Sequence, residues 1–130
     1  MKLGYMIIYV PNVAESLAFF ESAFGLSRRF LHESGDYGEL DTGETVLAFA
    51  SHELGKMNLP SGFIAANASN QPLGFEVAFV TAVVAEAHKT ALSAGATEVK
   101  APESKPWGQI VSYVRCPDGT LVEICSPVGG

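Results

Sequence analysis

The feature that most constrains this chain is an internal repeat, because one order of elements occurs twice. Residues 3–10 (LGYMIIYV) form an apolar, β-branched run that predicts a buried strand. Residues 13–24 (VAESLAFFESAF) predict a helix with one apolar face, which Gly25 ends. Three strand-like runs follow, at 26–33, 36–41 and 45–51.

The second half repeats this order. Residues 73–80 (LGFEVAFV) predict a strand, 83–94 predict a helix, and three strands are predicted near 97–100, 108–115 and 120–126. The closing strands match in residue type, VLAFAS at 46–51 against LVEICS at 121–126. Residues 52–72 are rich in Gly, Pro, Asn and Ser and predict a linker. We therefore expect one α+β domain over 1–130, built from two βαβββ modules at about 1–51 and 73–130.

The net charge and the hydropathy of the chain limit the kinds of partner and the location that we expect. The chain carries 8 Lys and Arg against 14 Asp and Glu, for a net charge of −6, which argues against nucleic acid. The excess of acidic residues either lies on a solvated surface or favours a cationic ligand. The first apolar run is too short for a signal segment or a membrane span, so we expect a cytoplasmic protein. Cys116 and Cys125 are expected to be reduced core thiols.

Two motifs resemble a known family. They are V-x-N-V-x-x-S-L-x-F-F at 10–20, followed by G-L at 25–26, and KPWGQIVSYVRCPDGTLVEICSP at 105–127. Both resemble the vicinal oxygen chelate superfamily, and the second is most similar to its bleomycin-resistance proteins. The resemblance implies a curved mixed sheet that forms a cup, and a homodimer whose partner often completes that cup. It leaves the function open among glyoxalases, extradiol dioxygenases, thiol transferases, epimerases and drug-sequestering proteins.

Metal-using members of the superfamily hold one divalent ion with four strand residues, from the first and last strand of each module. Aligned on the helices, the first of these positions falls at Tyr5, or at Met6 after a slip of one residue. The internal repeat superposes Ala48 on Glu123, so the first module lacks the expected carboxylate. The second module keeps an acid at both positions, Glu76 and Glu123.

With two of four positions lost, we expect no complete metal site and no cofactor. The alternative is a single divalent ion on Glu76 and Glu123, completed by waters or His52, in a glyoxalase- or dioxygenase-like enzyme. Without metal, one of the two acids could serve as a general base. His32 and His88 are expected to be solvated surface residues.

Aromatic residues are well placed for ligand contact on the predicted strands. The first strand offers Tyr5 and Tyr9, the fourth offers Phe49 or Ala48, and Trp107 begins the seventh. An aromatic surface beside two acids suits a flat or cationic ligand, unless those acids pair internally with Arg115 or Lys105. The leading interpretation is a small-molecule-binding protein of the bleomycin-resistance type. Its expected ligand contacts are Tyr5, Tyr9, Phe49, Glu76, Trp107 and Glu123.

Overall fold

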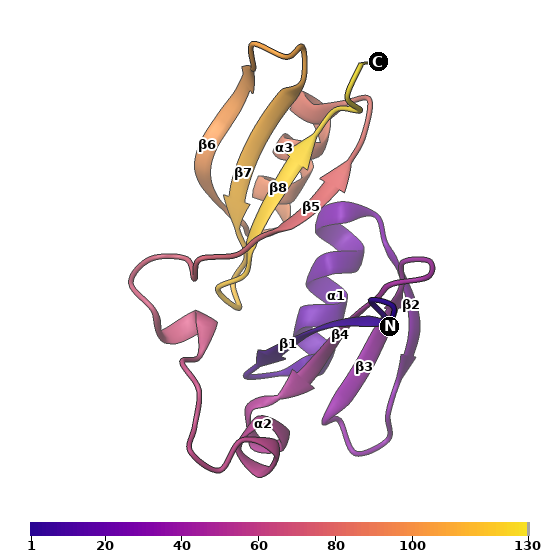
Figure 1. Ribbon diagram of the computed structural model, residues 1–130, viewed down its shortest axis with the longest axis vertical. Helices are drawn as coiled ribbons and strands as arrows, with labels where there is room; N and C mark the ends of the chain where they lie inside the picture. The colour runs from indigo at the N-terminus through magenta and orange to yellow at the C-terminus, as the bar shows by residue number, and fades with distance from the viewer. Residues whose placement is uncertain (130) are drawn as a thin grey trace.

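A computed structural model describes residues 1–129 and shows two four-stranded sheets (Figure 1). The first module consists of β1 (Tyr5–Val10), α1 (Val13–Phe24), β2 (Ser27–Leu31), β3 (Tyr37–Asp41) and β4 (Val46–Ser51). The second consists of β5 (Val77–Val80), α3 (Val84–Ala94), β6 (Thr97–Ser104), β7 (Ile110–Arg115) and β8 (Leu121–Cys125). The α+β fold class with two βαβββ units is confirmed.

The two sheets share one topology. Their strand orders are β1-β4-β3-β2 and β5-β8-β7-β6, and in each the first strand runs parallel to the last. Ile7 lies opposite Ala48 in the first sheet, and Ala78 lies opposite Glu123 in the second. This register agrees with the superposition of Ala48 on Glu123. It also makes Tyr5 the counterpart of Glu76, which lies just before β5 rather than within a longer strand.

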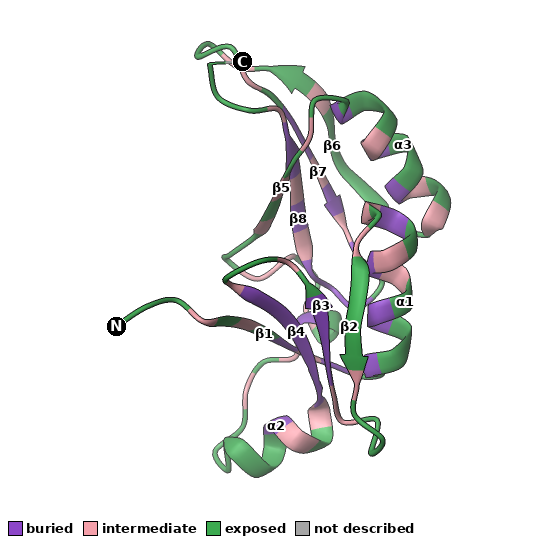
Figure 2. Ribbon diagram, turned by 90° about the vertical axis from the view of Figure 1, so that its right-hand side faces the viewer, coloured by how far each residue is buried: buried purple, intermediate pink, exposed green. Residues whose placement is uncertain are grey.

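Each sheet has one face covered by helix and one face open. Side chains alternate across a strand, so Ile8 and Val10 enter the core while Ile7 is 44% exposed. Leu17 and Phe20 of α1 are fully buried against the covered side. Figure 2 shows α1 and α3 together on one side of the molecule, and the open sheet faces lie on the other.

The two modules are joined through α1. Phe24 of α1 packs on Phe79 of β5 with ring centroids 5.0 Å apart, and Phe20 lies 6.3 Å from the same ring. The Ser16 hydroxyl of α1 donates a buried hydrogen bond of 2.8 Å to Asp118, in the turn between β7 and β8. The first helix therefore packs against both modules.

The residues between the modules are more ordered than a plain linker. They contain the helix α2 (His52–Asn58) and a 3-10 turn, η1 (Ala66–Ala68). Arg115 of β7 holds this segment, because its guanidinium donates to the carbonyl oxygens of Ser69 and Ala66 at 2.8 and 2.9 Å. Arg115 is thus committed to the backbone and does not pair with Glu76 or Glu123.

His88 corrects one expectation. It is not a solvated residue but is 3% exposed, on the same face of α3 as the buried Val84 and Ala91. Both ring nitrogens have partners, Ser112 Oγ at 2.9 Å and Glu98 Oε2 at 2.8 Å. A histidine can occupy a core position when both nitrogens are satisfied, and the helical spacing alone does not reveal those partners.

Within residues 1–129, no helix has both the length and the apolar character needed to cross a bilayer.

The contact between Gly119 and η1 gives a test of this architecture. Gly119 has φ +94°, and a Cβ there would lie 2.3 Å from the Ala66 carbonyl oxygen. We expect Gly119→Ala to lower the free energy of unfolding by about 2–4 kcal/mol, measured by chemical denaturation. Gly43→Ala is the matched control, because Gly43 has φ +88° but open space around it. It should cost only about 1–2 kcal/mol, and equal losses would show that the contact with η1 is unimportant.

Candidate functional site

Two carboxylates meet on the open face of the second sheet. Val122 and Ile124 enter the core, so Glu123 between them faces the open side. Tyr113 lies directly opposite Glu123 on β7, and its hydroxyl donates a 3.0 Å hydrogen bond to Glu123 Oε1. Glu76 lies beside Glu123 and interacts with its carboxylate. The structure therefore brings together the two acids that the sequence singled out.

The proximity of the two acids separates their pKa values. The hydrogen bond with Glu123, followed by partial burial and charge repulsion, raises the pKa of Glu76 to about 7. Burial would raise the pKa of Glu123, but hydrogen bonds from Glu76, Cys125 and Tyr113 outweigh it and hold the pKa below its usual range. The pair therefore shares one proton and carries a single negative charge between the lowered pKa of Glu123 and about pH 7.

Two neighbouring groups respond to this charge. Burial and the hydrogen bond to Glu123 raise the pKa of Tyr113 to about 12. Burial, with the nearby Glu123 carboxylate, raises the pKa of the Cys125 thiol to about 11. Both groups remain protonated at neutral pH and serve as hydrogen-bond donors to Glu123. Cys116 and Cys125 are buried free thiols, as expected.

Trp107 lies apart from the carboxyl pair in sequence, on the turn between β6 and β7. Its side chain is exposed, and its indole N–H donates to Gln109 Oε1 at 2.8 Å. Gln109 in turn donates to the Ser126 carbonyl oxygen at 2.9 Å, which fixes the turn to the end of β8. Lys105, on the same turn, bonds Glu103 at 3.0 Å and contributes positive charge near Glu123.

The open face of the first sheet carries a second polar cluster, which the sequence did not reveal. The Tyr37 hydroxyl donates a 2.7 Å hydrogen bond to Glu39 Oε2, and Arg29 Nε lies 3.8 Å from Glu39 Oε1. Glu39 lies opposite Ala48, on the face that also bears Tyr5 and Ile7. The first module thus has a carboxylate after all, one strand away from the position where the repeat predicts it.

The other sequence candidates divide between the two faces of the first sheet. Phe49 is a correction, because it points into the core and its ring lies 4.9 Å from Phe20. Its neighbour Ala48 has the open-face orientation, as its superposition on Glu123 in the internal repeat indicates. Tyr9 packs on Phe63 of the linker at 5.0 Å. His52 also contacts Phe63, and its buried Nε2 has no hydrogen-bond partner within residues 1–129.

A pocket of about 530 Å³ lies where the two sheets meet. Glu76 and Ala78 line its second-sheet side, and Met6 and Leu47 line its first-sheet side. Its volume is in the range of small-molecule sites, and its lining is mostly apolar. Glu76 therefore belongs to the carboxyl pair and also lines an apolar cavity.

The donor set does not match a divalent metal. Catalytic metal sites in proteins generally use three or more side-chain ligands. Within the described chain, His, Cys, Asp and Glu form no group of three or more with the arrangement of a metal site. Glu76 and Glu123 supply only two ligands, and the counterparts Tyr5 and Ala48 add no usual one.

The shared proton predicts a pH-dependent effect of Glu76→Gln. The pKa of Glu76 is about 7 in the folded chain against 4.5 for an ordinary glutamate, so its ionisation destabilises the fold as pH rises through 7. Glutamine mimics the protonated acid. The melting temperature of Glu76→Gln should match that of the natural chain near pH 5 and exceed it near pH 8. Glu44→Gln, on an exposed turn, should show no such rise; a constant difference at all pH values would contradict the shared proton.

Comparisons with known proteins identify the family. The profile of the glyoxalase-like domain matches residues 3–129. None of the curated proteins compared with the chain matches it. A glyoxalase-related enzyme from Fulvimarina pelagi superposes with a TM-score of 0.82 at 18% identity, over 98% of this chain and 88% of that one. A glyoxalase/bleomycin resistance protein/dioxygenase family enzyme from Burkholderia phytofirmans PsJN gives 0.79 at 23%, over 97% and 98%.

A third solved structure, from Sphaerobacter thermophilus DSM 20745, is a member of the same superfamily. It superposes with a TM-score of 0.70 at 19% identity, over 98% of both chains. At such identities these likenesses show the fold alone. The family profile covers nearly the whole chain, both βαβββ modules included, and the chain therefore belongs to the glyoxalase-like domain family.

Proposed function

We propose that this protein binds a small organic cation with an apolar or aromatic body, without using a metal. The observation that carries the proposal is the Glu76–Glu123 pair on an open sheet face. One proton between two carboxyl groups leaves a charge with which no arginine or lysine of the described residues forms an ion pair, because Arg115 is bonded to backbone carbonyls and Lys105 to Glu103. An ammonium group can compensate that charge and donate hydrogen bonds to the carboxylate oxygens.

Exposed apolar side chains support a ligand with an apolar body. Tyr5 is 57% exposed on the open face of the first sheet, and Trp107 is 59% exposed on the turn between β6 and β7. Exposed aromatic side chains offer contact to the apolar body of a ligand. The apolar pocket beside Glu76 offers a cavity of suitable size.

We further propose that the protein is a homodimer whose second copy closes the cup. The two sheets lie one beyond the other along the molecule (Figure 1), and their open faces look to the side away from the helices (Figure 2). Within residues 1–129, no element covers either open face completely, since Tyr5, Ile7 and Val80 remain exposed. A second copy that lays its first sheet over this second sheet would shield both faces and enclose the ligand.

The alternative is a divalent-metal-dependent enzyme of the glyoxalase or dioxygenase type. Only the same carboxyl pair favours it, as two of the ligands that such a site needs. Because residues 1–129 supply no third ligand beside them, we expect purified protein to hold well under one metal ion per chain after exposure to manganese, nickel, zinc or iron(II). Mass spectrometry of metals measures this. A stoichiometric ion that Glu123→Ala abolishes would favour the enzyme.

Binding of benzylamine tests the proposed function directly. We expect it to change Trp107 fluorescence and to bind about tenfold more tightly than the neutral benzyl alcohol, since a charge-assisted hydrogen bond contributes about 1.5 kcal/mol. Glu123→Gln should abolish this preference, and Glu44→Gln should leave it intact. Equal affinity for the amine and the alcohol in the natural chain would refute the role of the acid pair.

A further inference from the structure

The carboxylate of Glu39 is nearly buried but only half satisfied. Its side chain is 10% exposed. Oε2 accepts the Tyr37 hydroxyl at 2.7 Å. Oε1 has no donor within hydrogen-bond distance among residues 1–129, since Arg29 Nε, its ion-pair partner, lies 3.8 Å away. Oε1 is not among the buried side-chain atoms without a partner in the described residues, so it remains accessible to water or to a donor of a ligand.

The position of Glu39 relates it to the acid pair of the other module. Glu39 lies opposite Ala48 on β3, as Tyr113 lies opposite Glu123 on β7. Each open face therefore bears one tyrosine whose hydroxyl donates to one glutamate. The two tyrosines lie on equivalent strands, β3 and β7, but the glutamate lies on β3 in the first sheet and on β8 in the second. Ala48 lies between Ile7 and Glu39 in the same row of the sheet and is fully buried.

We propose that Glu39, positioned by Tyr37, is a second anionic ligand contact that selects ligands with two separated N–H donor groups. The unpaired Oε1 would accept one ammonium group, and the Glu76–Glu123 pair would accept the other. Phe30 and Ile7 flank Glu39 in the same row of the sheet, and both are more than two-fifths exposed. They provide apolar contact for the body of the ligand between its charged ends.

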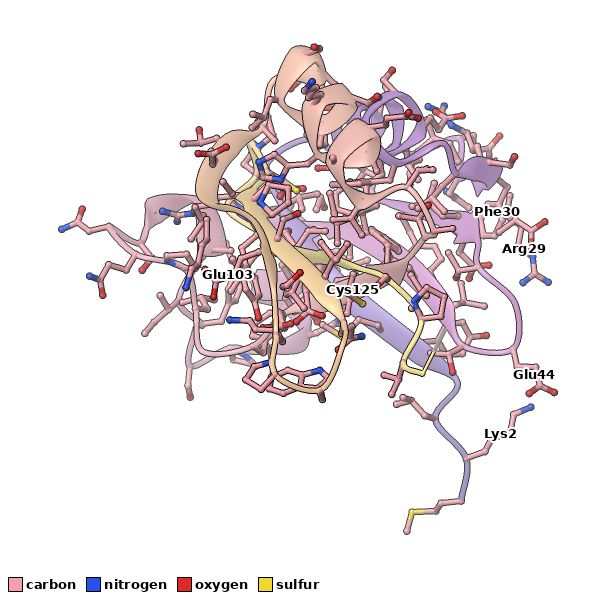
Figure 3. The ribbon with its side chains drawn as sticks, turned by 90° about the horizontal axis from the view of Figure 1, so that it is seen from above. Lys2, Arg29, Phe30, Glu44, Glu103 and Cys125 are labelled. Carbon is pink, nitrogen blue, oxygen red and sulfur yellow. The ribbon has the colours of Figure 1, made fainter. Side chains whose placement is uncertain are left out.

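Arg29 modulates this contact without occupying it. Its side chain is 56% exposed and stands at the irregularity in the pairing of β2 with β3. It projects from the edge of the molecule beside Phe30 (Figure 3). An exposed ion pair of this length is weak, so an ammonium group at hydrogen-bond distance would displace the guanidinium from Oε1.

The two contacts belong to different copies of the chain, an inference that rests on the dimer proposed above. Arg29 and Glu103, at the far edges of the two sheets, lie on opposite sides of the molecule (Figure 3). The first sheet of one copy, carrying Glu39, would therefore face the second sheet of its partner, carrying Glu76 and Glu123. Each dimer would then hold two equal composite sites.

Aliphatic amines test the proposal by calorimetry. α,ω-Diaminoalkanes of increasing length are compared with the monoamine of the same carbon number. At the best length, the diamine should bind the natural chain about tenfold more tightly, as one added charge-assisted hydrogen bond predicts. Glu39→Gln should remove that preference and leave monoamine affinity within about twofold. Tyr37→Phe should reduce the preference in part, and Glu44→Gln should retain it.

Mixed dimers then locate the second contact. A dimer of one Glu39→Gln chain and one Glu123→Gln chain should keep one intact site, with full diamine affinity at half the natural stoichiometry. Loss of both sites would overturn the partner arrangement. An unchanged diamine preference in Glu39→Gln would overturn the role of Glu39 and leave the monoamine site standing. Failure of every amine to bind would instead refute the proposed function and this inference with it. Thermal melts confirm that each variant folds.

Discussion

The packing of α1 against the second module is the contact on which the rest of the structure depends. Phe24 lies against Phe79, and the buried Ser16 hydroxyl is bonded to Asp118. The burial of these aromatic rings supplies most of the stabilising energy of this contact. The hydrogen bond fixes the orientation of α1 against the second module, because it satisfies a polar group that has no access to water. With α1 shared, both sheets turn their helix-covered faces inward and their open faces to one side.

This arrangement decides which side chains can reach a ligand. In every strand, alternate residues enter the core, so the residues between them meet solvent or a partner. The same alternation that buries Phe49 turns Ala48 to the open face, and the same alternation that buries Ile124 exposes Glu123 to the cup. The site chemistry is thus a consequence of register, since a slip of one residue would exchange the acids for core residues.

Much of this could be predicted from the sequence. The repeated order of elements indicated two βαβββ modules, and the matched closing strands indicated that Ala48 and Glu123 are counterparts. Both acids of the second sheet were found because they occupy two of the four positions at which metal-using members of the resembled superfamily hold their ion. The hydrophobic periodicity could not identify Glu39, because β3 is short. This acid is recognised only through its contacts with Tyr37 on the same strand and Arg29 on β2. The periodicity also misplaced His88, whose polar partners come from two strands distant in sequence.

The two halves of the repeat keep the fold while their chemistry has diverged. In the second sheet two carboxyl groups share a proton, and the pair can accommodate a cation by releasing that proton. In the first sheet a single carboxylate is held by one hydroxyl and faces a distant guanidinium. Core positions of both halves are constrained by packing density, whereas an open-face position can exchange Ala for Glu without disturbing the core behind it. A repeat of this kind can therefore change its ligand while each module keeps the same register.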